Sequence, residues 1–574
     1  MTATTCAFKS GERRRFFIPL AIALLGLGID TVVAAYMAPT IDEHLHVAYG
    51  AKILKGDPDR PSVVFDSKMP VSVLNALPRA ASVYLERSGR LPRLAKILSD
   101  LRLTRWATIT AAFCLCLVVF FYAQALFGRT AALFAELLFV MDPNIVAHGS
   151  LSTTDLFVAL GAVLSLYCLR RFLLSPNVKN TALTAFTFAL AQLTKFTALY
   201  FYAVLALILV VVKLYARHGR GKRYDLPWSR ITALLTLSMV CFLVVVNAAF
   251  LFDRSFTPLA GYKFRTPFFW KLQQVPVLRA VPLPLPYAYV QGFDWMNWDN
   301  STATAFGNIA LLNQVRGPSL PRTDGFPAYY LFAYLFKEPI GMQIVLILSL
   351  VWIFRNRGPA DLLSGEGLLL VCAIVILTPF SFLSRTQIGI RHVLPVLAIF
   401  AILSGAAFHD WMTFSLRRKL LLIGCLLYAG VSVGSYFPHM IPYFNEIVTD
   451  RRQAYRFLAD SNLDWGQAAW EVQRFLKRNP DVVLNPPQRV VGRVLMSGNL
   501  VAGVWPRDAD NFVRVEGLRP VAQVGYAYFL FVVPPRLQAA GASMRALGGT
   551  GTGAVLDPLQ PAASTPGPAH GLRR

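Results

Sequence analysis

The sequence predicts a mainly α-helical, polytopic transmembrane bundle of about eleven spans, followed by a small α/β domain outside the membrane. Apolar residues make up 55% of the 574 residues and charged residues only 15%, against roughly 45–50% and about 25% in soluble proteins. The apolar residues also come in long runs, many of which approach the roughly 20 residues that a helix needs to cross a bilayer. This composition is that of a membrane protein and not of a large soluble core.

The chain starts with a basic segment and one long apolar run. Residues 1–15 carry Arg13, Arg14 and Arg15, and we expect this segment to be cytoplasmic. The run that follows, residues 16–37, is longer than the apolar core of a cleaved signal peptide. We interpret it as an uncleaved first transmembrane helix.

Ten further apolar runs complete the expected bundle, residues 16–437. The eleven expected spans are residues 16–37, 106–127, 130–147, 156–174, 181–194, 196–215, 231–252, 338–354, 366–383, 392–409 and 419–437. Short basic loops around Arg170, Arg355 and Arg417 all fall on the cytoplasmic side of this arrangement, as the positive-inside rule requires. The long loops 38–105 and 253–337 then lie outside, and we expect the chemistry there.

The C-terminal part has a different pattern. Residues 438–537 read as a small extracytoplasmic α/β domain, with one or two helices in 450–478 and strands at Val490–Met496 and Val521–Val533. Residues 538–574 are rich in Ala, Gly and Pro and are expected to be disordered. These features indicate a multi-pass protein of a bacterial inner membrane with its C-terminus outside the cytoplasm.

The net charge and its distribution limit the classes of binding partner. Lys and Arg total 56 and Asp and Glu total 31, giving +25. The basic residues lie mostly in loops between apolar runs, and no nucleic-acid-binding motif is present, so we expect no nucleic-acid partner. Membrane lipids or a lipid-phosphate substrate fit this distribution better. The seven cysteines form neither a disulfide framework nor a zinc motif.

The strongest candidate motif is Asp42-Glu43-His44-Leu45-His46, directly after the first span. Two carboxylates and two histidines at the membrane edge could supply a general base, a metal site or both. Asp42 and His46 would share a helix face at i, i+4, but two ligands are too few for a closed metal site. A solvated loop start is the plain alternative, and a divalent metal is possible without being indicated.

A second motif lies at the outer turn between the third and fourth spans. It runs from Asp142-Pro143-Asn144 through His148 to Asp155. Asp155 opens a membrane helix, where an N-cap role together with Thr153 or Thr154 is common. Ionisable residues at membrane depth are costly, however, and are functional candidates for that reason.

Three cations complete the candidate site. Lys68, Lys195 and Arg391 each stand at the outer edge, and His392 follows Arg391. Interfacial anchoring is one explanation, and aiming a positive charge at a lipid phosphate is the other. A sugar on a lipid phosphate needs a base for the acceptor's proton and cations for the departing phosphate. It needs no second carboxylic acid, unlike glycoside hydrolysis, because phosphate leaves as a stable anion.

These residues resemble a known family. The acidic pair after the first helix, Lys68-Met69-Pro70, Asp155 and Thr194-Lys195 are similar to motifs of membrane glycosyltransferases of the C-type fold. The likeness, over residues 16–470, is to the family-39-like group, which includes protein O-mannosyltransferases and bacterial aminoarabinose transferases. A less characterised bacterial branch is the most similar. Its pattern is present as Asp142-Pro-Asn with His148-Gly and Thr154-Asp155, as Gly389-Ile-Arg-His-Val-Leu-Pro395, and as Asp460-Ser-Asn-Leu-Asp464-Trp-Gly-Gln467.

The resemblance implies a polyprenyl-phosphate sugar donor, an outer-face cavity and inversion at the anomeric carbon. By position, it implies that Asp42 is the general base, that Glu43 assists or binds acceptor, and that Asp155 positions acceptor or a metal. Lys68, Lys195 and Arg391 would hold the donor phosphate.

Four histidines, His44, His46, His148 and His392, are possible substrate-binding groups. Ser67 stands where the aminoarabinose transferases carry Glu, so a shared metal site is not implied. The sequence leaves the sugar, the acceptor (lipid, protein or glycan) and the role of Asp464–Gln467 open.

Two other functional classes remain open at this point. A transporter would show midplane charges, broken helices and inverted repeats. No convincing repeat is present, and the polar groups gather at the outer edge. A non-catalytic envelope-assembly protein is the third possibility.

Overall fold

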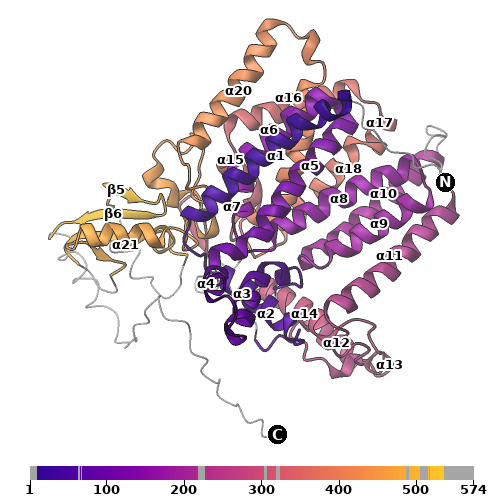
Figure 1. Cartoon of the computed structure of the whole chain (residues 1–574), viewed down its shortest axis with the longest axis horizontal. Coiled ribbons are helices and arrows are strands. Elements are labelled where there is room, and N and C mark those ends of the chain that lie inside the picture. Colours follow the sequence, from indigo (N-terminus) through magenta and orange to yellow (C-terminus); the bar gives the residue numbers. More distant parts are fainter. Residues whose placement is uncertain are drawn as a thin grey trace.

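The computed structural model describes residues 10–62, 65, 67–217, 226–302, 307–317, 324–486, 490–504, 515 and 517–535. Long helices lie side by side over most of the molecule, and a small sheet with one amphipathic helix lies at one edge (Figure 1). The tail 538–574, predicted to be disordered, lies outside the described residues, as do residues 1–9 of the expected cytoplasmic segment.

The bundle is built from helices that follow the apolar runs. They are α1 (Ser10–Tyr36), α5 (Trp106–Phe127), α6 (Arg129–Met141), α7 (Pro143–Gly149), α8 (Asp155–Leu174), α9 (Val178–Ala191), α10 (Leu199–Arg217), α11 (Trp228–Ala249), α15 (Tyr329–Lys337), α16 (Ile340–Asn356), α18 (Glu366–Phe382), α19 (Leu394–Ser404) and α20 (Leu416–Gly434). α5 and α8 pack against each other near the centre, with α1, α6, α9 and α19 around them.

Six helical stretches in the described part of the chain are long and apolar enough to cross a membrane. They are Phe17–Tyr36, Leu101–Phe127, Asp155–Leu174, Phe196–Arg217, Trp228–Ala249 and Ile390–Phe408. Two bent pairs raise the number to eight. They are α6 with α7, bent by 63°, and α15 with α16, bent by 115°. The chain is therefore a multi-pass membrane protein.

The expected number of eleven spans remains a prediction. The three expected spans outside this set correspond to α9, α18 and α20. α9 has 14 residues and α18 has 17, fewer than the roughly 20 that a straight crossing needs. α20 has 19 residues, and its second to fourth residues are Arg417, Arg418 and Lys419.

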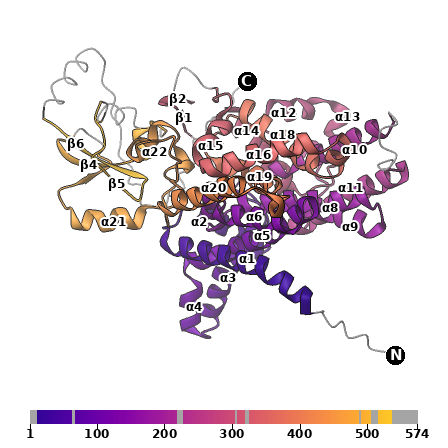
Figure 2. The same ribbon diagram turned by 90° about the horizontal axis from the view of Figure 1, so that it is seen from above.

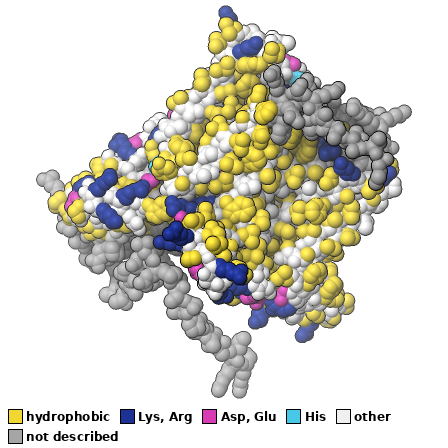
Figure 3. Space-filling model, in the orientation of Figure 1, with side chains coloured by type: hydrophobic (Ala, Val, Ile, Leu, Met, Phe, Trp, Pro, Cys, Tyr) yellow, Lys and Arg dark blue, Asp and Glu magenta, His cyan; other side chains and the backbone are white. Residues whose placement is uncertain are grey.

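The surface agrees with a membrane environment. Apolar side chains cover much of the long helices' outer face, whereas Lys and Arg gather toward the edges of the molecule (Figure 3). Leu427 is 66% exposed, Val431 74% and Ile347 59%. Large aliphatic side chains exposed in this number are unfavourable in water and ordinary in lipid.

The two long loops predicted to lie outside contain most of the short helices. The first holds α2 (Glu43–Leu54), α3 (Ser72–Arg87) and α4 (Pro92–Leu98), of which α3 and α4 project from the body (Figure 2). The second holds α12 (Pro267–Gln274), α13 (Pro276–Arg279), α14 (Tyr287–Thr302) and the hairpin of β1 (Ile309–Leu311) and β2 (Gln314–Arg316). α2 and α14 bring polar residues to the cavity described below.

The C-terminal region contains a four-stranded sheet of order β3-β4-β6-β5. Its strands are β3 (Val483–Leu484), β4 (Gly492–Ser497), β5 (Ala522–Val524) and β6 (Tyr528–Val533), and only the β3–β4 pair is parallel. The single strand expected over Val521–Val533 is two strands. Gly525 and Tyr526 both have φ of 56°, and this tight turn reverses the chain.

The sheet lies between one helix and the bundle core. Leu495 and Leu530 face α21 (Ala469–Arg478), whereas Met496 and Phe529 belong to the main apolar core. Side chains alternate between the two faces, as pleated strands require. The boundary predicted at residue 438 remains a prediction, since this sheet shares its inner face with the bundle.

Candidate active site

A cavity of about 740 Å³ lies where α8 and α10 begin and α18 ends. Its wall takes residues from both long loops and from the C-terminal region as well as from the bundle. Seven of the ten predicted site residues line this cavity. The lining members are Asp42, His46, Lys68, Asp155, Lys195, Arg391 and His392.

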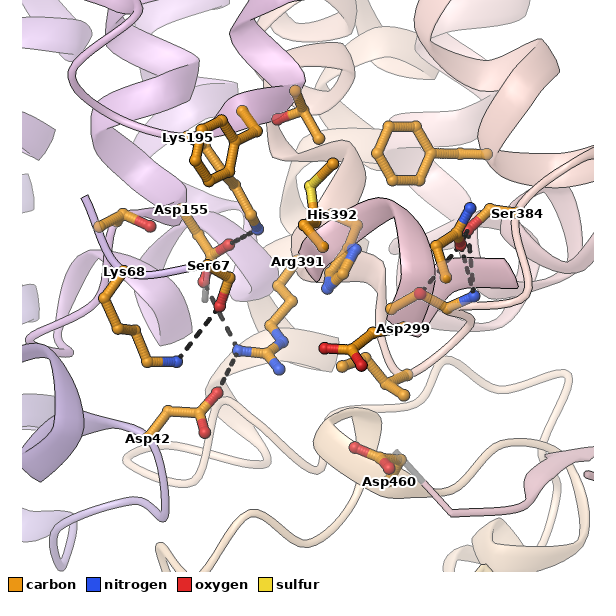
Figure 4. Close-up of a pocket in the computed structure, with 18 of the residues that line it drawn as sticks. Asp42, Ser67, Lys68, Asp155, Lys195, Asp299, Ser384, Arg391, His392 and Asp460 are labelled. Atoms are coloured by element: carbon orange, nitrogen blue, oxygen red, sulfur yellow. Dashed lines mark hydrogen bonds and ion pairs between the residues drawn. The ribbon is translucent and has the colours of Figure 1, made fainter. Parts of the chain in front are cut away.

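Four of these residues form a continuous chain of alternating charge (Figure 4). Lys195 Nζ lies 2.5 Å from Asp155 Oδ1, Arg391 Nη1 lies 3.8 Å from Asp155 Oδ2, and the same Nη1 lies 3.0 Å from Asp42 Oδ2. These residues are 40 to 349 positions apart in the sequence. The fold therefore assembles groups that no local pattern could have connected.

Asp42 reaches the cavity from the N-cap position of α2. Its side chain makes no capping bond and contacts Arg391 instead. Burial alone would raise the pKa of the Asp42 carboxyl, but the charges of Lys68 and Arg391 outweigh burial and hold that pKa well below its usual range. Asp42 is therefore ionised at physiological pH in the empty site.

Asp155 is the first residue of α8, and Thr154 before it makes no side-chain capping bond. The Asp155 carboxylate is nearly buried and faces the Lys195 ammonium instead of the helix end. The positive end of the α8 dipole favours a negative charge at this position. The ion pair, and not the predicted N-cap role, accounts for the orientation of this side chain.

His46 and His392 both line the cavity. His46 Nδ1 lies 3.3 Å from Ser72 Oγ. Burial, together with the nearby Lys68 charge, lowers the pKa of His46, so this imidazole is neutral at physiological pH. A neutral imidazole can donate and accept one hydrogen bond each.

The segment Asp464–Gln467, whose role the sequence left open, links Arg391 to the residues that precede Asp42. Its backbone carbonyls at Trp465 and Gln467 accept hydrogen bonds from the N–H groups of Ile41 and Ala38, at 3.1 and 3.0 Å. The Trp465 ring covers the guanidinium of Arg391, with its centroid 4.0 Å from Cζ. This segment therefore holds the chain just before Asp42 while it packs on Arg391.

Three predicted site residues do not line the cavity. Glu43 is fully buried and bonds both carboxylate oxygens to Arg105, at 2.8 and 2.7 Å. His44 is exposed, and His148 is buried beside Trp465, with ring centroids 6.0 Å apart. For Glu43 this geometry favours a structural role over the catalytic role that its position in the motif suggested.

Two carboxylates that the sequence did not single out as site residues also face the cavity. Asp299 comes from α14, and Asp460 comes from the 3₁₀ turn η10 (Asp460–Asn462). Figure 4 shows Asp299 beside Arg391 and Asp460 in the lower part of the view, away from Lys68 and Lys195. Asp460 opens the motif that ends at Gln467, so the motif carried the signal, whereas Asp299 has no local pattern that could have revealed it.

One part of the cavity wall is apolar. Its members are Leu199, Tyr200, Phe293, Met296, Phe380 and Leu383. Leu383 is 77% exposed, so this wall continues onto the outer apolar surface of the bundle. A ligand with a charged head and an apolar tail would find both kinds of surface in one cavity.

The described residues contain no group of three or more His, Cys, Asp or Glu side chains placed to hold a metal ion. Asp42 and Asp155, the nearest candidates, each contact a cationic side chain instead. These two carboxylates are thus already neutralised by Arg391 and Lys195.

One part of the chain matches a known protein family. Residues 96–249 match the family model described as dolichyl-phosphate-mannose-protein mannosyltransferase. No curated protein matches the chain. The predicted resemblance to mannosyltransferases is therefore confirmed for the segment from α4 to α11, and the chain resembles a family of membrane glycosyltransferases.

Several solved structures are similar over most of the chain at low identity. A structure of ArnT from Cupriavidus metallidurans bound to undecaprenyl phosphate is 14% identical, with a TM-score of 0.44, and the match covers 91% of this chain and 98% of that one. Archaeal oligosaccharyltransferase AglB from Archaeoglobus fulgidus, in complex with an inhibitory peptide and a dolichol-phosphate, is 10% identical. Its TM-score is 0.45, and the match covers 90% of this chain and 74% of that one.

Proposed function

We propose that this protein is an inverting glycosyltransferase that moves a sugar, in the hexosyltransferase class, from a polyprenyl-phosphate carrier to an acceptor. The observation that carries the proposal is the charge chain Asp42–Arg391–Asp155–Lys195 inside one cavity. The match of residues 96–249 to a family that uses a polyprenyl-phosphate sugar supports it. The acceptor is a lipid, a protein or a glycan.

The cationic residues bind the donor phosphate. Lys68, Lys195 and Arg391 supply three positive charges, and Asp42 and Asp155 supply two negative ones, so these five residues, counted without Asp299 and Asp460, carry 3 − 2 = +1. A sugar-phosphate-lipid diester carries one negative charge and neutralises this excess. The apolar wall that ends at the exposed Leu383 holds the first part of the polyprenyl chain.

Asp42 acts as the general base. In the empty cavity Arg391 and Lys68 hold its pKa low, which makes it a weak proton acceptor. A donor phosphate that engages these two cations screens them from Asp42, so the carboxylate becomes more basic when the donor is bound. The site thereby ties the activation of the base to the presence of the donor.

The transfer is a single displacement. The acceptor oxygen forms a bond to the anomeric carbon while the bond between that carbon and the phosphate oxygen breaks. The acceptor's proton passes to Asp42, and the bonding pair leaves with the phosphate, which Lys68, Lys195 and Arg391 stabilise as it departs. Attack opposite the leaving group inverts the configuration at the anomeric carbon.

The reaction takes place on the outer face of a bacterial inner membrane. The cavity is lined from the loops 38–105 and 253–337 and from the C-terminal region. In the proposed topology the N-terminus is inside and these segments are outside, because the short basic loops then face the cytoplasm. Reporter fusions after residue 535 test this topology. Reporter activity restricted to the cytoplasm would contradict it.

Mass spectrometry of the cell envelope tests the function. A strain without the gene should lose one glycan modification and accumulate the matching lipid-linked sugar. Expression of the wild-type protein should reverse both changes, and Asp42→Asn should reverse neither. Unchanged glycans and lipid-linked sugars in the deletion strain would contradict the proposal.

A further inference from the structure

Asp460 faces the cavity but has no part in the proposed transfer. Among the described residues, no Lys, Arg or His nitrogen lies within ion-pair distance of its carboxylate, whereas Asp42 and Asp155 each have such a partner. Its Oδ1 accepts one hydrogen bond, from the N–H of Ser461 at 2.5 Å. Figure 4 shows the carboxylate across the cavity from Lys68 and Lys195, without a contact to either.

The backbone around Asp460 is fixed from three sides. Its N–H donates to Asn499 Oδ1 at 2.7 Å, the next N–H donates to the Ile388 carbonyl at 3.1 Å, and Asn462 Nδ2 donates to the Tyr329 hydroxyl at 2.9 Å. Asp460 itself has φ of 57°, a conformation that costs free energy in a non-glycine residue and is kept where surrounding contacts impose it. The carboxylate is thus held in a defined place facing the cavity.

Asp464, in the same motif, is a carboxylate with a structural role and serves as a comparison for Asp460. Asp464 accepts hydrogen bonds from the Ser497 hydroxyl and from the Gly466 N–H, the latter at 3.0 Å. Asp464 therefore joins the motif to the sheet through Oδ2 and bonds within the motif through Oδ1. Within the described part of the chain, the side chain of Asp460 makes no comparable contact across elements.

We propose that Asp460 is a binding residue for carbohydrate hydroxyl groups, on the part of the cavity wall away from Lys68 and Lys195. An ionised carboxylate only accepts hydrogen bonds, and hydroxyl groups are the donors that a sugar presents. It would repel the donor phosphate, which belongs with the cations. Hydrogen bonds to a charged acceptor are about twice as strong as neutral ones. The hydroxyl groups belong either to the transferred sugar or to a glycan acceptor.

The protonation of Asp460 gives this site a pH dependence. Burial raises the pKa of its carboxyl to about 7, against the opposing effect of the Arg391 charge. Asp42 and Asp464 also act on it, and Tyr329 and Tyr330 of α15 lie near it. Because the ionised form accepts hydroxyl donors on both oxygens and binds them more strongly than the protonated acid, affinity rises with pH. From pH 6 to 8 the ionised fraction of a group with this pKa grows about tenfold.

This inference rests on the proposed function. The following experiment distinguishes a failure of the inference from a failure of the proposed function. The full-length protein in detergent is given two probes, namely undecaprenyl phosphate without a sugar and the lipid-linked sugars extracted from the native membrane. Transfer of labelled sugar to an envelope fraction measures the KM for the acceptor. The variants are Asp460→Ala and Asp460→Asn, so that one remains if the other fails to fold. Asp481→Asn is the control, because Asp481 is exposed and pairs with Arg493 at 3.0 Å.

We expect both Asp460 variants to bind undecaprenyl phosphate like the wild type and to raise one KM by about tenfold or more. A raised KM for the lipid-linked sugar assigns Asp460 to the transferred sugar, and a raised KM for the envelope fraction assigns it to the acceptor. That KM should fall about tenfold between pH 6 and 8 in the wild type and stay flat in Asp460→Asn.

Unchanged KM values and an unchanged pH profile in both variants would overturn the inference while the proposed function stands. So would a loss of undecaprenyl phosphate binding in these variants, because it would mean that Asp460 acts through Arg391. If the wild-type protein itself fails to bind undecaprenyl phosphate, the proposed function is wrong and the inference falls with it.

Discussion

Glu43 and Asp42 are adjacent carboxylates, yet the structure predicts that removing the Glu43 charge mainly lowers stability and that removing the Asp42 charge mainly lowers activity. Glu43 is fully buried and accepts hydrogen bonds from Arg105, from the Thr40 N–H at 2.8 Å and from the Ser152 N–H at 2.8 Å. Glu43→Gln turns one of these acceptors into a donor that faces other donors. It also leaves the fully buried Arg105 guanidinium without its counter-ion.

The size of the effect follows from what remains around Arg105. Breaking a buried ion pair by removing one partner costs about 3–5 kcal/mol. Arg105 keeps hydrogen bonds to the carbonyls of Ala34, Met37 and Ala38, at 2.5, 3.0 and 3.1 Å. These carbonyls partly compensate the charge, so we expect a loss near the lower end, about 3 kcal/mol. Asp42→Asn should cost about 1 kcal/mol, because the Asp42 side chain is partly exposed.

Unfolding by sodium dodecyl sulfate in mixed micelles, followed by tryptophan fluorescence, measures these free energies. Glu86→Gln is the control, since Glu86 is exposed on α3. In the double variant Glu43→Gln with Arg105→Gln, the loss should be smaller than the sum of the single losses, because both buried charges are gone. A Glu43→Gln protein as stable as the wild type but inactive would refute this reasoning and restore the catalytic role predicted for Glu43.

Three further predictions concern the cavity. Lys195→Met should weaken binding of undecaprenyl phosphate at least tenfold in a titration with the purified protein, and unchanged affinity would exclude Lys195 from the donor site. Gly389→Ala should lower the transfer rate, because a Cβ there would overlap Ser461 Oγ and displace the turn that carries Arg391; normal activity would show that the turn adjusts. Without donor, Asp42 should stay ionised between pH 8 and pH 5, because its pKa lies well below that range; an infrared band of a protonated carboxyl that appears in this range and is lost in Asp42→Asn would contradict the charge assignment.

The sequence predicted the membrane class and most of the site because both depend on local patterns. Long apolar runs identify helices wherever they occur, and short motifs identified Asp42, Lys68, Asp155, Lys195 and Arg391. Their mutual contacts could not be predicted, because each pair is brought together only by helix packing. The sharp bends between α6 and α7 and between α15 and α16 also escape a periodicity argument, since each half remains apolar and helical.

Adjacency in sequence did not predict which side chains face the cavity. Glu43 follows Asp42 directly, but on α2 the next residue points about 100° away, toward Arg105 instead of the cavity. Asp460 and Asp464 show the same effect within a single motif, since one faces the cavity and the other bonds to the sheet. Only side-chain direction separates the two roles, and spacing alone does not fix direction in irregular turns.

The release of polyprenyl phosphate tests the central claim most directly. The purified wild-type protein is incubated with lipid-linked sugars extracted from the native membrane and with an envelope fraction as acceptor, and free polyprenyl phosphate is measured by mass spectrometry. We predict release by the wild-type protein and a rate at least about a hundredfold lower for Asp42→Asn. No release by the wild-type protein, or equal release by Asp42→Asn, would contradict this account.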